Sequence, residues 1–322
     1  MSLEVRDLTV YYQTLRGDVR ALENATFTIE SGEIMGLAGE SGCGKTTLGH
    51  SLIYLAPPMK HIGGRVTLND VDLPIADIEA MNPHRFRDVS IIPQYAMNAM
   101  NPVRKIGRMT EELLRSKGVD YAQIRPELQR RLDLVRLRPD VMDLYPIELS
   151  GGMKQRMVMV LSTLLNPFLL IADEITSALD VASQKAVAQM LVEFREQDCC
   201  KSAMVITHDI SILYQIADSI MIMYAGQIAE KAATDTIIHE PRHPYTKLLI
   251  STLPEIGAQY TRKRLQGIAG KPPLLLLPPA GCRFRERCPV ADAKCVQTPP
   301  LLEVEAGHSV ACWREVERRA QA

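Results

Sequence analysis

Residues 39–47 read GESGCGKTT, from Gly39 to Thr47, and this stretch decides the fold. It fits the G-x-x-x-x-G-K-[ST] pattern of a Walker A phosphate-binding loop without a gap. An apolar run, Ile34 to Ala38, precedes it and predicts a buried strand, while residues 47–53 predict a helix. Glycines at this place let the backbone curl so that successive N–H groups point at phosphate oxygens. We therefore predict a nucleotide-phosphate site in a strand, loop and helix, and a chance glycine loop is the disfavoured alternative.

Two side chains of this loop have distinct predicted functions. Lys45 supplies a mobile positive charge for the β- and γ-phosphates, and Thr46 offers a hydroxyl to Mg²⁺. The loop residues predicted to contact the nucleotide are Gly39, Ser41, Gly42, Cys43, Gly44, Lys45, Thr46 and Thr47.

The composition is that of a globular protein with a sizeable core. The chain has 322 residues, of which 46% are hydrophobic and 23% charged, so we expect two domains. A formal charge of -1 gives no basic field that would attract nucleic acid, and we predict no nucleic-acid partner. The start resembles no signal peptide, and no apolar run approaches a spanning length. We therefore place the chain in the cytosol, where the seven cysteines are thiols or metal ligands rather than disulfides.

Ahead of the loop, residues 3–29 alternate like antiparallel strands. Tyr12 closes the first strand and could stack on a base, although the residues alone favour an ordinary half-buried aromatic. Further on, residues 89–92 predict a buried strand, after which Gln94 could reach a metal or a phosphate. A glutamine at such a position is usually solvated, so Gln94 carries little weight by itself.

A charged segment, residues 103–147, has apolar residues at helical spacing and predicts a helical insertion broken by Gly118, Pro126, Pro139 and Pro146. The sequence ELSGGMKQR follows at 148–156 and predicts a helix that begins at Ser150, a suitable N-cap residue. Gly151 and Gly152 let a ligand approach the backbone closely, so this is a second potential phosphate site.

Polar residues follow two further apolar runs. Residues 168–172 predict a strand that ends in Asp173 and Glu174, where bare carboxylates are costly unless they bind a metal or position water. We expect Asp173 to face Mg²⁺ and Glu174 to polarise an attacking water. Residues 203–206 predict another strand, followed by His208; a lone histidine is usually structural, but its place at a strand end raises the odds of a function.

Beyond residue 232 the chain is rich in proline, with one short predicted helix at 244–253. Four cysteines gather there: Cys282, Cys288, Cys295 and Cys312. Their spacing is wider than that of usual zinc pairs, so zinc is possible but an iron–sulfur cluster fits better. Unrelated thiols are the third alternative.

Taken together, these residues resemble an ABC-transporter ATP-binding subunit. The stretch LSGGMKQ at 149–155 separates these ATPases from other Walker-type ATPases, and the order Walker A, Gln94, LSGGMKQ, LLIADE, SALD and TH matches over residues 1–230. In the tail, HPYT at 243–246, GKPP at 270–273 and the GCRF cysteine pattern at 281–312 are similar to the oligopeptide/dipeptide importer group.

The resemblance implies a function for each candidate residue. Tyr12 would stack on adenine, Gln94 would touch Mg²⁺ and report to the permease, Glu174 would be the catalytic base, and His208 would lie near the γ-phosphate. Thr46, Gln94 and Asp173 would contact Mg²⁺, with Asp180 as the D-loop aspartate. Ser150, Gly151 and Gly152 would hold the ATP of the opposite subunit, and Cys282, Cys288, Cys295 and Cys312 would hold a [4Fe-4S] cluster.

The fold implied is an α/β P-loop NTPase (RecA-like) core with an antiparallel β subdomain. The ATPase domain would span residues 1–232, with a helical subdomain inserted at about 95–165. A small loop-rich C-terminal domain with the cysteines would span residues 233–322.

The function implied is ATP hydrolysis that powers an importer through closure of an ATPase dimer. A heterodimer with a second ATPase subunit is favoured and a homodimer stays open; two transmembrane permease subunits and, indirectly, an external solute-binding protein complete the assembly at the cytoplasmic face of the membrane. Oligopeptides or dipeptides are the expected cargo, with oligosaccharides or nickel as alternatives. A soluble ABC ATPase without a permease is the alternative from another class, and the cysteine tail could be a redox sensor rather than a structural staple.

Three positions depart from the family pattern. Ile175 stands where proline is usual after the Walker B glutamate, and QYAMNAMNP at 94–102 alters the segment expected to contact the permease. Cys43 replaces a more frequent serine, so we expect an oxidation-sensitive loop.

Overall fold

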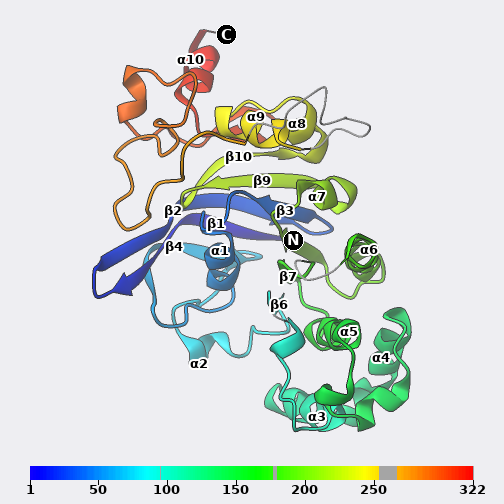
Figure 1. Cartoon of the computed structure of the whole chain (residues 1–322). Coiled ribbons are helices and arrows are strands. Elements are labelled where there is room, and N and C mark those ends of the chain that lie inside the picture. Colours follow the sequence, from blue (N-terminus) through cyan, green and yellow to red (C-terminus); the bar gives the residue numbers. More distant parts are fainter. Residues whose placement is uncertain (95, 177–179, 254–266, 322) are drawn as a thin grey trace. The chain divides into compact units, whose positions relative to one another are not determined.

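The computed structural model describes residues 1–94, 96–176, 180–253 and 267–321. The chain divides into two compact units, the first made of residues 1–78 and 204–322 and the second of residues 79–203. The domain boundaries predicted from the sequence, at residue 232 and at about 95–165, stay predictions. Figure 1 follows the chain through its helices and strands.

The first unit contains two sheets. One is antiparallel with the order β2-β1-β4-β5, formed by β1 (Ser2–Thr14), β2 (Gly17–Glu30), β4 (Met59–Leu68) and β5 (Val71–Asp72). The antiparallel start predicted from alternation is therefore confirmed. The second sheet includes strands in the order β11-β12-β10-β9-β3-β8. These strands are β3 (Ile34–Ala38), β8 (Ser202–Ile206, whose first two residues belong to the second unit), β9 (Ser219–Tyr224), β10 (Gln227–Ala233), β11 (Leu302–Glu305) and β12 (His308–Val310).

The strands at the centre of this second sheet are the apolar runs of the sequence. Every residue of β3 is buried, and β3 pairs in parallel with β9, which is buried from its second residue on. Parallel strands covered on both faces read as continuous apolar runs, which is why composition alone located them. The helices of this unit are α1 (Lys45–Ser51), α7 (Ile210–Ile216), α8 (Thr234–His239), α9 (Pro244–Ser251) and α10 (Trp313–Gln321).

The tail after residue 232 has more regular structure than its proline content indicated. Strands β11 and β12 extend the sheet through pairing of β12 with β10, and α8 and α9 lie against β10 (Figure 1). Short strands in which only alternate residues are partly buried give too weak a pattern to be recognised in the sequence. A 3₁₀ turn, Ala293–Val296, lies between Cys288 and β11.

The second unit pairs two parallel strands with a group of helices. Strand β6 (Val89–Ile92) lies beside β7 (Leu169–Asp173), and α5 packs on β6. The helices are α2 (Ile78–Met81, whose first residue belongs to the first unit), α3 (Ile106–Ser116), α4 (Tyr121–Leu134), α5 (Gly151–Thr163) and α6 (Val181–Glu196), with 3₁₀ turns at Ala96–Asn98, Pro139–Asp143 and Pro146–Glu148. The helical spacing predicted within residues 103–147 is confirmed by α3 and α4.

One predicted helix break is wrong. Pro126 lies inside α4, where its missing N–H removes only the hydrogen bond that would have reached the carbonyl of Ala122 in the first turn. The cap at Asp120, whose side chain accepts from the Ala122 N–H, precedes Pro126 and fixes where α4 begins. Among the helices in the described part of the chain, none is both long and apolar enough to cross a bilayer.

Candidate active site

The Walker A loop lies between β3 and α1 of the first unit and is built so that only glycine fits at two positions. Gly39 has φ 150°, and a Cβ there would lie 2.2 Å from the carbonyl oxygen of Met223. Gly44 has φ 105°, and a Cβ there would lie 2.3 Å from the carbonyl oxygen of Ala21. The loop is thus packed directly onto neighbouring backbone, which fixes its path.

Lys45 occupies the inside of this loop. Its side chain is buried, and Nζ donates to the carbonyl oxygens of Gly39 (2.9 Å) and Glu40 (3.2 Å). The ammonium group therefore lies at the centre of the curl in which a phosphate would lie. Ser41, Gly42 and Thr46 are exposed, so the outer rim of the loop is open to a ligand.

Two other predicted residues of the first unit can be located. The hydroxyl oxygens of Tyr12 and Thr47 lie 3.2 Å apart, so Tyr12 sits beside the first turn of α1. His208 is exposed and follows β8; the N–H of Thr207 donates to the carbonyl of Leu37 in β3. The strand end that carries His208 is therefore held against the strand that leads into the Walker A loop.

Cys43 does not have the surroundings of a reactive thiol. It is 4% exposed, and burial raises its pKa although the nearby Lys45 lowers it. A protonated, inaccessible thiol is a poor nucleophile, which argues against the oxidation sensitivity expected from the sequence.

The second unit brings Gln94 and Glu174 together. Parallel pairing of β6 with β7 aligns Ile92 with Ala172, so the two strand ends lie side by side. Gln94 Nε2 then donates to Glu174 Oε2 at 2.8 Å, while Asp173 is fully buried at the end of β7. Glu174 has φ 46°, a left-handed conformation that costs a non-glycine residue on the order of 1 kcal/mol and is concentrated at functional sites.

The residue after Glu174 is tied to the LSGGMKQ helix. The Ile175 side chain is buried, and the backbone carbonyl of Ile175 accepts from Gln155 Nε2 at 2.6 Å. Gln155 is the last residue of the LSGGMKQ stretch and lies in α5. Although Ile175 stands where the family usually has proline, its backbone carbonyl thus joins the end of β7 to α5 through a hydrogen bond.

The N-terminus of α5 is exposed and open, as a second phosphate site requires. Ser150 caps the helix, with Oγ accepting from the Met153 N–H at 3.3 Å, which confirms the predicted start. Gly152 is exposed, and a Cβ added there would meet no heavy atom within 4 Å.

Asp180 has a structural function of its own. Its carboxylate caps α6 by accepting from the Ser183 N–H (3.0 Å) and hydroxyl (2.8 Å), and these hydrogen bonds lower its pKa. The preceding residues 177–179, the first three of the SALD stretch, lie outside the described residues.

The four tail cysteines gather in one region as thiols, and none of the chain's seven cysteines forms a disulfide. Burial, together with the proximity of Cys295, Cys288 and Cys312, raises the pKa of Cys282 to about 11. The Cys282 N–H also donates to the Cys295 carbonyl at 3.0 Å. Within the described ranges, however, no three Cys, His, Asp or Glu side chains are arranged to hold a metal ion. Four cysteine thiols are the ligands that an iron–sulfur cluster requires, but the positions of these four side chains do not match such a site.

Sequence reasoning missed three residues around the Walker A loop. Both carboxylate oxygens of Glu40 accept from Arg287, and the Glu40 N–H donates to the hydroxyl of Tyr245. Glu40 occupies a variable position of the Walker A motif, so the sequence did not single it out. Tyr245 belongs to HPYT, and the one available signal was that this stretch resembles the importer group without an assigned function.

Comparison with known proteins gives consistent matches. Residues 22–177 match the family described as ABC transporter, and residues 229–295 match the oligopeptide/dipeptide transporter C-terminal region. The chain is 36% identical to the oligopeptide transport ATP-binding protein OppD of Salmonella typhimurium, over 98% of this chain and 94% of the relative. It is also 36% identical to the dipeptide transport ATP-binding protein DppD of Bacillus subtilis, over 99% and 96%.

A solved structure supports the fold. The dimeric structure of a bacterial ABC transporter cassette superposes with a TM-score of 0.63 at 23% identity, covering 72% of this chain and 98% of that one. This likeness confirms the predicted α/β P-loop fold.

Proposed function

The chain belongs to the ABC transporter family of ATP-binding subunits and carries the C-terminal region of oligopeptide/dipeptide transporters, and from that premise we propose that it hydrolyses ATP to power import of peptides. The observation that carries the proposal is the end of β7. The buried strand β7 ends in Asp173 and is followed by Glu174, whose backbone has a left-handed φ. The Gln94 side chain donates a hydrogen bond to the Glu174 carboxylate.

We propose a function for the candidate residues of each unit by itself. In the first unit, Lys45 and the loop N–H groups of residues 39–47 would bind phosphate oxygens, and Thr46 would offer its hydroxyl to Mg²⁺. Tyr12 would contact the base, and His208 would contact the γ-phosphate. In the second unit, Glu174 would orient the attacking water, and Gln94 and Asp173 would contact a bound Mg²⁺. Bound Mg²⁺ would counter the charge that develops between the phosphates.

The exposed start of α5 supports a second copy of the same architecture as the partner. Ser150, Gly151 and Gly152 present helix N–H groups on an open surface, where they would reach the nucleotide bound to a facing subunit. We propose a dimer that ATP closes and hydrolysis reopens, with a heterodimer as first choice and a homodimer as the other outcome.

Peptide as cargo rests on the relatives, which are named as oligopeptide and dipeptide transport proteins. We propose that the chain binds two membrane permease subunits and so lies at the cytoplasmic face of the membrane. An external binding protein would select the cargo, with oligosaccharides or nickel as alternatives. Co-purifying the permease and binding protein and measuring which solute the latter binds distinguishes these cargoes.

The ATPase proposal is tested by phosphate release and nucleotide binding with Mg²⁺. Lys45→Ala is expected to lose nucleotide binding, and Glu174→Gln to keep binding while hydrolysis falls by about a hundredfold or more. Glu196→Gln, an exposed carboxylate at the end of α6, is the matched control and keeps wild-type turnover. Wild-type hydrolysis by Glu174→Gln would remove Glu174 from the reaction.

The [4Fe-4S] cluster on Cys282, Cys288, Cys295 and Cys312 is a separate proposal. It is supported by the four thiols gathered in one region and by the resemblance to the importer group. Anaerobically purified protein should contain about four iron and four sulfide per chain. Protein without iron and sulfide, in which the thiols react with a thiol reagent, would contradict it.

A further inference from the structure

An ion pair joins the Walker A loop to the segment that carries the tail cysteines. Arg287 Nη1 lies 2.7 Å from Glu40 Oε2, and Arg287 Nη2 lies 2.9 Å from Glu40 Oε1. Two parallel bonds between a guanidinium and a carboxylate fix direction as well as distance. This ion pair therefore fixes Glu40, the loop residue directly after Gly39, to Arg287, which lies 247 residues later in the chain.

Arg287 is itself held rigidly. Its side chain is 6% exposed, and each of its five N–H donors has an acceptor. Besides the two Glu40 oxygens, the acceptors are Tyr224 Oη (3.1 Å), Ala269 O (2.9 Å) and Ile268 O (3.2 Å). The guanidinium carbon also lies 5.7 Å and 5.9 Å from the ring centroids of Tyr224 and Phe284. These contacts hold the Arg287 guanidinium in the orientation that its two bonds to Glu40 require.

The backbone of Glu40 is held by Tyr245 of the tail and by Lys45 at once. Its N–H donates to the hydroxyl of Tyr245, a fully buried residue of α9, at 2.9 Å. Its carbonyl accepts from Lys45 Nζ at 3.2 Å. Any movement of Glu40 therefore changes the oxygen that positions the Lys45 ammonium.

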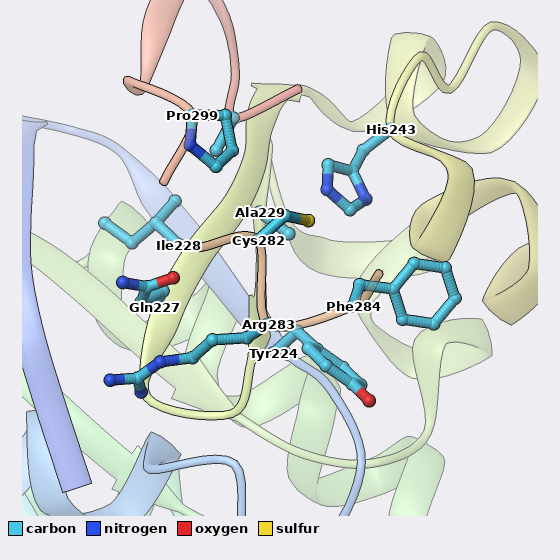
Figure 2. A pocket seen from close by; sticks show the side chains of 10 residues that line it. Tyr224, Gln227, Ile228, Ala229, His243, Cys282, Arg283, Phe284 and Pro299 are labelled. Atoms are coloured by element: carbon cyan, nitrogen blue, oxygen red, sulfur yellow. The ribbon is translucent and has the colours of Figure 1, made fainter. Parts of the chain in front are cut away.

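The same segment also braces the far end of the loop. Arg283 donates to the carbonyl of Ala225 and to the Glu23 carboxylate, and the N–H of Gly226 donates to the Cys43 carbonyl at 2.8 Å. Figure 2 shows the Arg283 side chain pointing to the opposite side of the segment from Phe284. The cavity beside them holds only about 20 Å³, which is room for about one water molecule.

We propose that Arg287 is a positioning residue that holds the Walker A loop in its phosphate-binding form, so that nucleotide affinity depends on the cysteine-bearing segment, residues 282–288. Without Arg287 the Glu40 carboxylate is released, and the loop must be ordered each time a nucleotide binds. Glu174 is not among the contacts of Arg287, so we expect the effect on binding rather than on the chemical step.

The test compares full-length variants by MgATP titration and steady-state hydrolysis, and it rests on the proposed function. Arg287→Ala is expected to raise the Kd and the KM for MgATP at least about tenfold while kcat stays within about twofold. Arg287→Lys keeps the charge but not the fork, and restores only part of the affinity. Arg285→Ala, in the same segment and outside these contacts, is the matched control and keeps the wild-type Kd.

A double-mutant cycle separates positioning from stability. Glu40→Ala is expected to raise the Kd as Arg287→Ala does, and the double variant is no weaker than either single variant. A merely structural role would lower the melting temperature and the folded fraction but leave the Kd of the folded fraction unchanged, and that result would overturn the proposal. If the wild type binds ATP and Lys45→Ala does not, but Arg287→Ala matches Arg285→Ala, the positioning role fails while the ATPase function stands. A wild type that binds no ATP removes both.

Discussion

His243, the N-cap of α9, is expected to make the folded state less stable as pH falls from 7 to 5. The side chain is 4% exposed, and its Nδ1 accepts the Tyr245 N–H at 3.0 Å, which requires a neutral ring. Burial lowers the pKa of His243 to about 4, against the opposing effects of the Glu230 charge and a hydrogen bond to the Ala311 backbone. Protonation would destroy the cap on the helix that presents Tyr245 to the Walker A loop.

The magnitude follows from the difference between the two pKa values. The unfolded chain takes up the proton near 6.5 and the folded chain only near 4, so stability is complete above 6.5 and falls as pH decreases between these values. With about 1.4 kcal/mol per unit, lowering the pH from 7 to 5 costs about 2 kcal/mol. Glu230 has a lowered pKa and adds its own loss only at lower pH.

The assay is urea unfolding of the wild type and His243→Asn at pH 7 and pH 5. Asparagine still offers an acceptor to the Tyr245 N–H but does not titrate, so the variant should lose about 2 kcal/mol less than the wild type over this interval. His61→Asn, at a histidine of the strand β4, is the control and should keep the wild-type difference. Equal losses in wild type and His243→Asn would refute a buried neutral His243.

Two further substitutions are expected to change the free energy of unfolding in opposite directions. Gly152→Ala is expected to stabilise the chain by roughly 0.5 kcal/mol, because alanine favours a helix and the site is open. It is also expected to lower hydrolysis, because the proposed facing nucleotide would pack there. A higher melting temperature with unchanged turnover would contradict the contact in trans. Glu230→Ala leaves the N–H groups of Arg242 and His243 and Nε2 of His308 without their acceptor in the interior, which should cost roughly 3–5 kcal/mol in urea unfolding. A loss below about 1 kcal/mol would show that these three donors find other acceptors.

Local motifs made the central part of the fold predictable. The Walker A glycines, the cap at Ser150 and the apolar run that ends at Asp173 are short-range features, and the structure places β3, α5 and β7 where they were expected. Pairing of β6 with β7 then brings Gln94 to Glu174, because both residues follow the ends of these strands. The sequence predicted a function for each residue but not this contact.

Contacts over long sequence separations left no such pattern. Arg287 and Glu40 are 247 residues apart, and Glu230 and His308 are 78 apart. A single charged residue carries no information about which opposite charge it will meet, because pairing depends on how β10, α9 and the tail pack. The arrangement of the cysteines was unpredictable for the same reason, since spacing along the chain does not fix side-chain directions.

The most direct measurement is the mass in solution of Glu174→Gln by light scattering, with and without MgATP. It is made on this chain alone and on this chain mixed with the proposed second ATPase subunit. ATP sandwiched between two facing cassettes predicts a complex of two ATPase subunits that forms only with MgATP and is lost when Lys45→Ala is added. Separate subunits at saturating MgATP, both alone and mixed, would contradict the proposal that nucleotide-driven closure is what this protein contributes.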